Sequence, residues 1–281
     1  MNFRFRHIPF FTFTCMVILI GVMVIVFSAE FIVPHNPVKQ NLADRLKPPS
    51  FYTSGSKQYW LGTDHLGRDL LSRIVYGSRI SLAVGISSVL IGGFIGTLLG
   101  MISGFWGGKL DEVIMAIVDI QLAFPLILLS IAVIAVLGPS FINLIIVIGI
   151  SGWVTYARIA RGQVLGLKKK EFIEAVRAVG GSKYRIIFLH ILPNILSPLI
   201  VVGTLDMART IILESTLSFL GLGIRPPTPS WGVMLSEGRE YLTDAWWIAT
   251  FPGIALMFTT LSFNMIGDWL RDITDPRRSG Y

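Results

Sequence analysis

Residues 80–105 read ISLAVGISSVLIGGFIGTLLGMISGF, an uncharged and largely apolar run. The hydrocarbon core of a bilayer is about 30 Å thick, and a helix crosses it in roughly 20 residues. A strand of a membrane barrel would alternate polar and apolar side chains, and this run does not alternate. A helix is the other structure that satisfies its own backbone hydrogen bonds in lipid. The run therefore predicts a transmembrane helix.

Glycine recurs at every fourth position of this run, at Gly92, Gly96, Gly100 and Gly104. Residues four apart share one face of a helix. Small residues on one face allow the backbone of a second helix to approach closely. The spacing thus predicts a packing surface for another helix of a bundle.

Similar runs lie on both sides of this one, at 10–33, 113–137, 141–156, 195–220 and 246–269. The run at 141–156 is short and is expected to continue into the basic residues after it. The chain is 53% hydrophobic and 15% charged, with a mean hydropathy of +0.67, unlike a soluble domain. We predict an all-α polytopic membrane protein with six transmembrane helices. Its parts are an N-terminal segment with the first helix (1–34), an external loop region (35–79) and a core of five helices (80–281).

The basic residues predict how these helices are oriented. The net charge is +7, but Lys and Arg flank the apolar runs, a pattern that orients membrane helices and does not indicate nucleic-acid binding. The cluster Lys168-Lys169-Lys170 indicates that its end of the bundle faces the cytoplasm. With six spans, both termini then lie in the cytoplasm. The basic residues near them are Arg4, Arg6, Arg271, Arg277 and Arg278.

Two features of the first run affect its interpretation. It is longer than the roughly 7–15 apolar residues of a signal peptide, so we expect it to remain as a helix. It also holds Cys15, the chain's single cysteine, which can form no intrachain disulfide.

Several polar or ionisable residues fall inside the predicted helices, where a charge costs several kcal/mol if it faces lipid. They are Asp119, Asp206, Arg209, Glu214 and Ser218. One interpretation is that they line a translocation path. The alternative is that they form hydrogen bonds between helices. Asp206 and Arg209 are three residues apart and could also neutralise each other.

The segment 171–193 reads EFIEAVRAVGGSKYRIIFLHILP and lies between two predicted spans. Residues 171–179 predict a short amphipathic helix, and Gly180 and Gly181 allow a break with positive φ. Ser182 is a good N-cap for a second helix at 183–190, and Pro193 is expected to mark its end. An amphipathic elbow of this kind could dock on another protein or rest on lipid.

This elbow resembles the EAA loop of the permeases of binding-protein-dependent ABC importers. The pattern of that loop is E-A-A, three residues, Gly, nine residues, then I-x-L-P. Glu174, Ala175, Gly180 and Leu192-Pro193 match at the right spacing. Val176 replaces the second Ala, and His190 stands at the Ile position.

Two further stretches are similar to the dipeptide, oligopeptide and nickel branch of that family. LGTDHLGRD at 61–69, followed by Ser72-Arg73, resembles the stretch before the second span. SFLGLG at 218–223, with Pro226-Pro227 and PSWG at 229–232, resembles the loop after the fifth. The closing Arg271-Asp272 and Asp275-Pro276-Arg277 also fit.

The resemblance implies a type I ABC importer permease fold and ATP-driven uptake, with di- or oligopeptides as the expected substrate. The implied partners are a second homologous permease subunit, two cytoplasmic ATPase subunits, an external substrate-binding protein and membrane lipid, in a bacterial or archaeal inner membrane. The sequence contains no GxxxxGK[ST] phosphate loop. We therefore expect no enzyme activity in this chain, and no cofactor beyond the ATP and Mg²⁺ held by the ATPases.

The resemblance also assigns two sets of residues. Coupling to the ATPases would use the loop at about 157–193 and, within it, Glu174, Ala175, Val176, Gly180, Gly181 and Ser182. The mouth that faces the binding protein would include Asp64, Arg68, Asp69, Arg73, Pro227 and Trp231. Trp246 and Trp247 are instead expected at a membrane interface.

Two alternatives stay open. Within the same family the substrate could be nickel, a metallophore or glutathione. From another class, an ion-coupled secondary transporter would use Asp119, Glu214 or Asp268 as ion sites and often shows inverted repeats. The sequence shows no such repeat. The four histidines are scattered without metal-ligand spacing, so no metal site is predicted.

Overall fold

The computed structural model of the chain describes residues 9–53 and 55–274. Arg4, Arg6, Arg277 and Arg278, and the motif Asp275-Pro276-Arg277, lie outside the described residues. The helices are α1 Phe10–Ile32, α2 Leu70–Trp106, α3 Gly108–Leu122, α4 Leu126–Leu137, α5 Phe141–Leu167, α6 Glu171–Ala178, α7 Lys183–Arg185, α8 Leu192–Phe219, α9 Trp231–Gly238 and α10 Trp247–Thr274.

Five helices are long and apolar enough to cross a membrane: α1, α2, α5, α10 and the continuous helix Lys183–Phe219. The pair α3 and α4 passes the same test together but is bent by 88°, and it supplies a sixth span if counted as one. The break falls at Pro125, where proline removes a backbone donor. The predicted polytopic helical fold is therefore confirmed, with one span broken.

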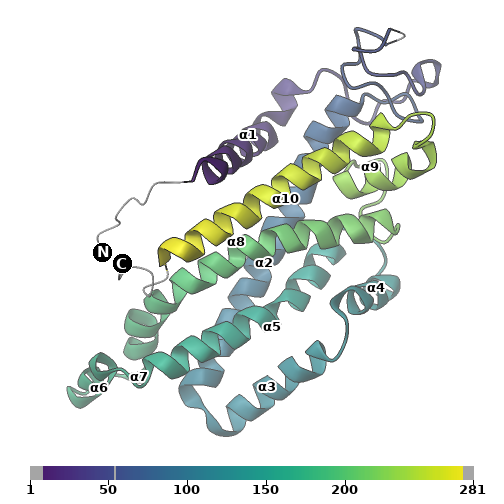
Figure 1. The fold of residues 1–281 in the computed structure, drawn as a ribbon. Helices are drawn as coiled ribbons and strands as arrows, with labels where there is room; N and C mark the ends of the chain where they lie inside the picture. Colours follow the sequence, from purple (N-terminus) through teal and green to yellow (C-terminus); the bar gives the residue numbers. More distant parts are fainter. Residues whose placement is uncertain (1–8, 54, 275–281) are drawn as a thin grey trace.

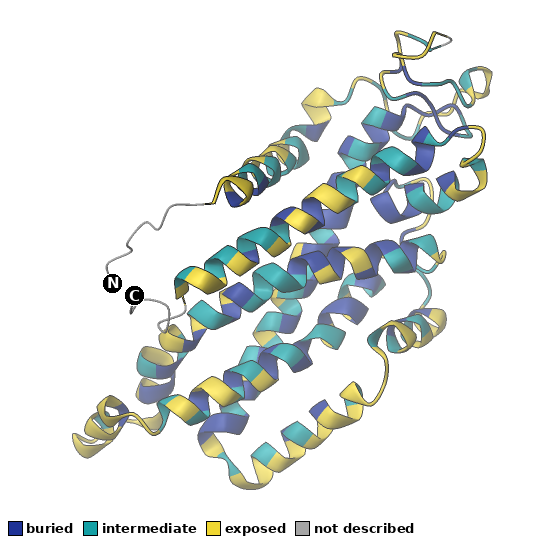
Figure 2. Cartoon of the chain, viewed as in Figure 1, coloured by how far each residue is buried: buried dark blue, intermediate teal, exposed yellow. Residues whose placement is uncertain are grey.

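The helices lie side by side, with the start of α1, the end of α10 and the elbow at α6 all toward one end of the molecule (Figure 1). The opposite end carries the loop before α2 together with α9. Figure 2 shows that buried residues are concentrated in the helices around α2 and α8, whereas few residues of α1 are buried. In α1 the buried residues are Thr12, Cys15 and Ala29.

The glycine stripe of α2 packs directly against α5. A Cβ placed on Gly96 would lie 2.2 Å from the Trp153 carbonyl oxygen, and one on Gly100 would lie 2.3 Å from that of Ala157. Real Cβ atoms do not approach so closely, so both positions require glycine. The predicted close helix–helix packing is confirmed. As expected, α5 also continues past residue 156, to Leu167.

Two predicted boundaries differ from the structure. The helix α2 begins at Leu70, so the helical core starts before residue 80. Asp69 caps it, because its carboxylate accepts a hydrogen bond from the Ser72 amide at 2.9 Å. The helix that begins at Lys183 does not end at Pro193, but continues through a π-helical turn, Ile186–Ile191, into α8.

The π-helical turn explains how the helix passes Pro193. In an α-helix the proline ring would clash with the carbonyl four residues earlier. Here the Leu192 amide donates to the Ile187 carbonyl, five residues back, which widens the turn. Pro193 is the second residue of α8 and follows this widened turn directly.

Candidate functional site

The turn of the elbow and the cap after it have the geometry that the sequence predicts. Gly180 has a φ of +82°, a conformation open to glycine and costly for other residues. The Ser182 hydroxyl accepts a hydrogen bond from the Arg185 amide at 3.2 Å. Glu174, Ala175, Gly180 and Ser182 are exposed, and Val176 and Gly181 are half-buried.

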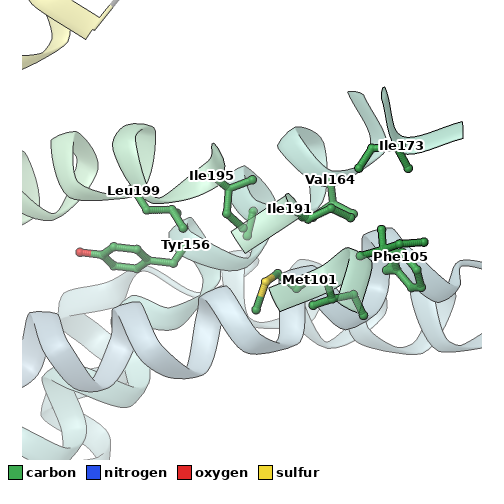
Figure 3. Close-up of a cluster of buried hydrophobic side chains, with 11 residues drawn as sticks. Met101, Phe105, Tyr156, Val164, Ile173, Ile191, Ile195 and Leu199 are labelled. Carbon is green, nitrogen blue, oxygen red and sulfur yellow. The ribbon is translucent and has the colours of Figure 1, made fainter. Parts of the chain in front are cut away.

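One side of the elbow is anchored in the helix bundle. Ile173 of α6 is fully buried in a cluster with Phe105, Val164 and Ile191, and Figure 3 shows these side chains converging from α2, α5, α6 and the π-helical turn. The other side carries large exposed apolar residues, with Val179 at 85% and Tyr184 at 69% exposure. This cluster joins the elbow to α2 and α5.

Polar contacts hold the helix ends together near the elbow. The Lys168 ammonium donates to the Phe105 carbonyl oxygen at 2.7 Å, which satisfies the carboxyl end of α2. Arg161 donates to both carboxylate oxygens of Asp111, at 2.5 and 2.6 Å. The ends of α2, α3 and α5 are thereby linked at the side of the elbow.

A cavity of about 270 Å³ lies between the α3–α4 break, α5 and α8. Asp206 and Arg209 line it, with Gln121, Ser151 and Thr155. The Tyr156 hydroxyl donates to Asp206 Oδ2 at 3.1 Å, whereas Arg209 is exposed. Of the predicted path residues, these two share one cavity.

The other predicted path residues lie elsewhere. Glu214 is fully buried and accepts hydrogen bonds from Ser218 at 2.8 Å and from Ser81 of α2 at 3.2 Å. In this conformation both Glu214 and Ser218 therefore serve packing between α2 and α8. Asp119 is exposed and pairs with Arg158 at 2.6 Å.

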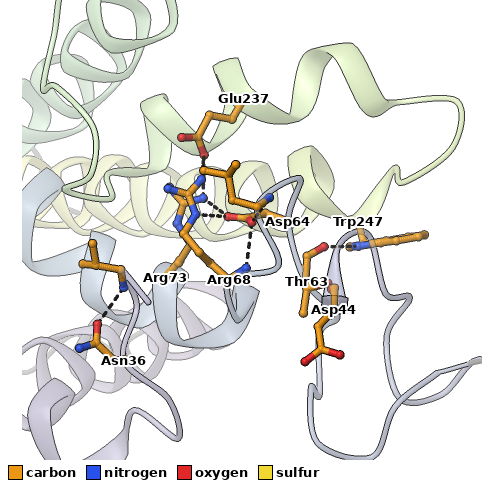
Figure 4. Close-up of polar contacts among 10 residues, drawn as sticks. Asn36, Asp44, Thr63, Asp64, Arg68, Arg73, Glu237 and Trp247 are labelled. Atoms are coloured by element: carbon orange, nitrogen blue, oxygen red, sulfur yellow. Dashed lines mark hydrogen bonds and ion pairs between the residues drawn. The ribbon is translucent and has the colours of Figure 1, made fainter. Parts of the chain in front are cut away.

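A charge network lies at the opposite end, between the loop before α2 and α9 (Figure 4). Arg68 donates to Asp64 at 2.6 Å and to Glu237 of α9 at 3.0 Å. Arg73 also pairs with both carboxylates, and its distance to Glu237 is 2.6 Å. Burial alone would raise the pKa of the Asp64 carboxyl, but Arg73 and Arg68 hold that pKa below its ordinary value.

This network changes the picture of the predicted mouth. Asp64, Arg68, Asp69, Arg73 and Trp231 are all buried, so their side chains are closed to a second protein in this conformation. Pro227, which follows a cis peptide bond with Pro226, is exposed. Trp247 is buried rather than interfacial, and its indole donates to the Thr63 carbonyl oxygen at 3.1 Å.

Glu237 completes the network and was missed by the sequence reasoning. It lies far along the chain from Asp64, and no local pattern links the two. Asp64, His65 and Glu237 present ligand atoms within 4.8 Å of one another. Both carboxylates are already paired with arginines, whose positive charges oppose a bound cation.

A bundle of membrane-crossing helices, an anchored elbow and a cavity between α5 and α8 are the features expected of a membrane permease subunit. Residues 96–280 match the family described as "Binding-protein-dependent transport system inner membrane component". The chain belongs to this family of ABC importer permeases, which excludes the ion-coupled secondary transporter.

Several characterised relatives align with most of the chain. The di/tripeptide transport system permease protein DppC of Pseudomonas aeruginosa is 42% identical over 92% of this chain and 86% of its own length. The dipeptide permease DppC of Alkalihalophilus pseudofirmus is 44% identical over 93% and 84%. The glutathione permease GsiD of Pectobacterium atrosepticum is 43% identical over 90% and 82%.

The fold is also found among solved transporters. The inward-facing MetNI methionine ABC transporter matches with a TM-score of 0.60 and 21% identity, over 73% of this chain and 98% of that chain. An amino acid ABC transporter matches with a TM-score of 0.55 and 13% identity, over 72% and 94%. At these identities the likeness concerns the fold alone.

Proposed function

We propose that this chain forms half of the translocation path of an importer of di- or tripeptides. The observation that carries the proposal is its extensive identity with permeases named for dipeptide and di/tripeptide transport. Glutathione is the second candidate, because a glutathione permease is similar to the same extent. A second permease, two ATPases that bind ATP and Mg²⁺, and an external binding protein would complete the transporter.

The test is ATP-driven uptake by the reconstituted transporter. Proteoliposomes with both permeases and both ATPases are supplied with binding protein and labelled dialanine or glutathione. Uptake of dialanine that stops without ATP supports the peptide proposal. Uptake of glutathione alone would identify glutathione as the substrate. Uptake of neither compound would refute both proposed substrates.

The elbow is proposed to couple ATP hydrolysis to transport. Its exposed face, with Phe172, Val179 and Tyr184, would sit in a groove of an ATPase subunit, and Glu174 would pair with a basic residue there. Because Ile173 is anchored in the bundle, movement of the ATPases would be passed to the membrane helices.

We expect Gly180→Val to uncouple the transporter. Valine is β-branched and disfavours the φ of +82°, so the elbow would lose its orientation. A cost of roughly 1–2 kcal/mol should lower peptide-stimulated ATP hydrolysis about 5- to 30-fold. The control is Gly21→Ala, a position in α1 where an added Cβ meets nothing within 4 Å. Normal coupled hydrolysis in Gly180→Val would sink the proposed role.

Both termini are proposed to lie in the cytoplasm with the elbow, and the loop before α2 outside. Single cysteines test this in a Cys15→Ser background. Lys169 and Lys57 are both exposed. Lys57→Cys should react with an impermeant maleimide in intact spheroplasts, and Lys169→Cys only after permeabilisation. The opposite result would invert the proposed topology.

A further inference from the structure

The cavity beside Asp206 and Arg209 lies along a helix that is long and apolar enough to cross the membrane. These residues occupy the middle of α8, Leu192–Phe219, and the α3–α4 break faces them across the cavity. Binding sites of membrane transporters commonly lie near the bilayer midplane, beside broken helices. The cavity thus combines a position along a membrane-spanning helix, a broken helix and two opposite charges.

Neither charge is neutralised by an ion pair within the described part of the chain. Arg209 is exposed, and none of its nitrogen atoms donates a hydrogen bond to a described residue. Asp206 receives one hydrogen bond, from the Tyr156 hydroxyl to Oδ2. Its attraction to Arg209 acts over a longer distance than an ion pair. A free charge inside a membrane helix is costly, so each of the two charges calls for a partner.

The positions of Asp206 and Arg209 on α8 suit the two ends of a dipeptide. Residues three apart on a helix lie on one face, with Cβ atoms about 5–6 Å apart. In an extended dipeptide the amino nitrogen and carboxyl carbon are about 6–7 Å apart, from standard backbone dimensions. Opposite α8, Gly152 of α5 leaves room, because an added Cβ there would meet only Asp206 Oδ2, at 3.8 Å.

The geometry points to a binding site for a dipeptide with free termini, its ammonium group on Asp206 and its carboxylate on Arg209. This inference rests on the proposed peptide-import function and adds the residues that would recognise the two ends. Charge-assisted hydrogen bonds are stronger than those between neutral groups. The two ends of the ligand would supply the charged partners that Asp206 and Arg209 lack within the described chain. Leu126, Leu129 and Leu213 give the remaining wall apolar surface.

The test measures peptide binding to the complete transporter in nanodiscs, without nucleotide and without binding protein. The probes are labelled dialanine, N-acetyl-dialanine and dialanine amide. Wild type should bind dialanine at least about tenfold more tightly than either blocked peptide, because each blocked end loses a charged contact. Omitting the binding protein ensures that its selectivity does not enter.

Two variants should shift this preference in opposite ways. Arg209→Gln should bind dialanine and its amide equally while still rejecting the N-acetyl peptide. Asp206→Asn should accept the N-acetyl peptide while still rejecting the amide. Glu30→Gln, which removes an exposed carboxylate at the outer end of α1, should keep both preferences. If Asp206 and Arg209 had only a structural role, the two substitutions would not change selectivity for the amide and for the N-acetyl peptide separately.

Three results would overturn the site. The first is that a transporter that imports dialanine shows no saturable dialanine binding. The second is that both variants lose binding of all three probes equally. The third is that both variants keep the wild-type preference among the probes. Equal loss would instead fit an ion pair between Arg209 and the second permease. Failure of the wild-type transporter to import any peptide would refute the proposed function itself.

Discussion

Replacing Arg73 by alanine should strongly destabilise the permease. Arg73 is 1% exposed and pairs with Asp64 and Glu237. Its removal leaves the buried Asp64 carboxylate and the half-buried Glu237 carboxylate with only Arg68 between them. Breaking a buried ion pair from one side costs about 3–5 kcal/mol. A thermal scan of the purified transporter should show the midpoint lowered by roughly 6–20 °C.

Two further variants separate charge balance from packing. Arg79→Ala breaks an exposed pair with Glu30 and should cost at most about 1 kcal/mol. Arg73→Met combined with Glu237→Gln restores neutrality and leaves the pair of Asp64 with Arg68. It also removes two buried nitrogens of Arg73 that have no hydrogen-bond partner. This double variant should be more stable than Arg73→Ala. A double variant that is as unstable as Arg73→Ala would contradict the electrostatic explanation.

The same network shows where sequence reasoning stops. The stretch LGTDHLGRD at 61–69 stands out in the sequence by its resemblance to a family motif. The resemblance could not show that Asp64 and Arg68 are buried, because their partner Glu237 comes from a helix much later in the chain. Hydropathy also placed the start of α2 too late, since Ser72, Arg73 and Ser78 reduce the apolar signal. The Asp69 cap was a local signal that could have corrected it.

The helix breaks were predicted unevenly for a physical reason. Gly180 acts through its own backbone freedom, so its sequence position suffices to predict a turn. The effect of a proline depends on its surroundings. Pro125 interrupts a span, whereas Pro193 is accommodated by a π-helical turn that no residue pattern announces. Pro252 lies within α10, which continues past it.

The sequence identifies the charged residues within the helices but does not show which of them line the cavity. Asp119, Asp206, Arg209 and Glu214 stand out because charges are rare within apolar runs. Sequence alone could not separate Glu214, which Ser81 and Ser218 satisfy, from Arg209, which faces a cavity. That separation depends on which helix lies opposite each side chain.

Gly96→Ala is expected to be far more harmful than the same change at Gly93, although the two glycines belong to the same helix. At Gly96 the new methyl group would lie 2.2 Å from the Trp153 carbonyl oxygen and 2.7 Å from Tyr156 Cβ. Backbone atoms cannot rotate away, so α2 and α5 must separate. Overpacking of this kind costs about 1–3 kcal/mol. The measurements are the thermal midpoint of the purified transporter and the yield of assembled complex.

Gly93→Ala is the matched control for this prediction. Its Cβ would lie 3.5 Å from the Tyr156 ring, an ordinary contact. Alanine also favours the helix over glycine by up to about 1 kcal/mol, so stability should be unchanged or slightly raised. Gly96→Leu should destabilise the packing of α2 on α5 further, because its side chain is larger. No assembled complex should then be recovered. Equal midpoints for Gly96→Ala and Gly93→Ala would show that α2 and α5 do not pack along the glycine stripe.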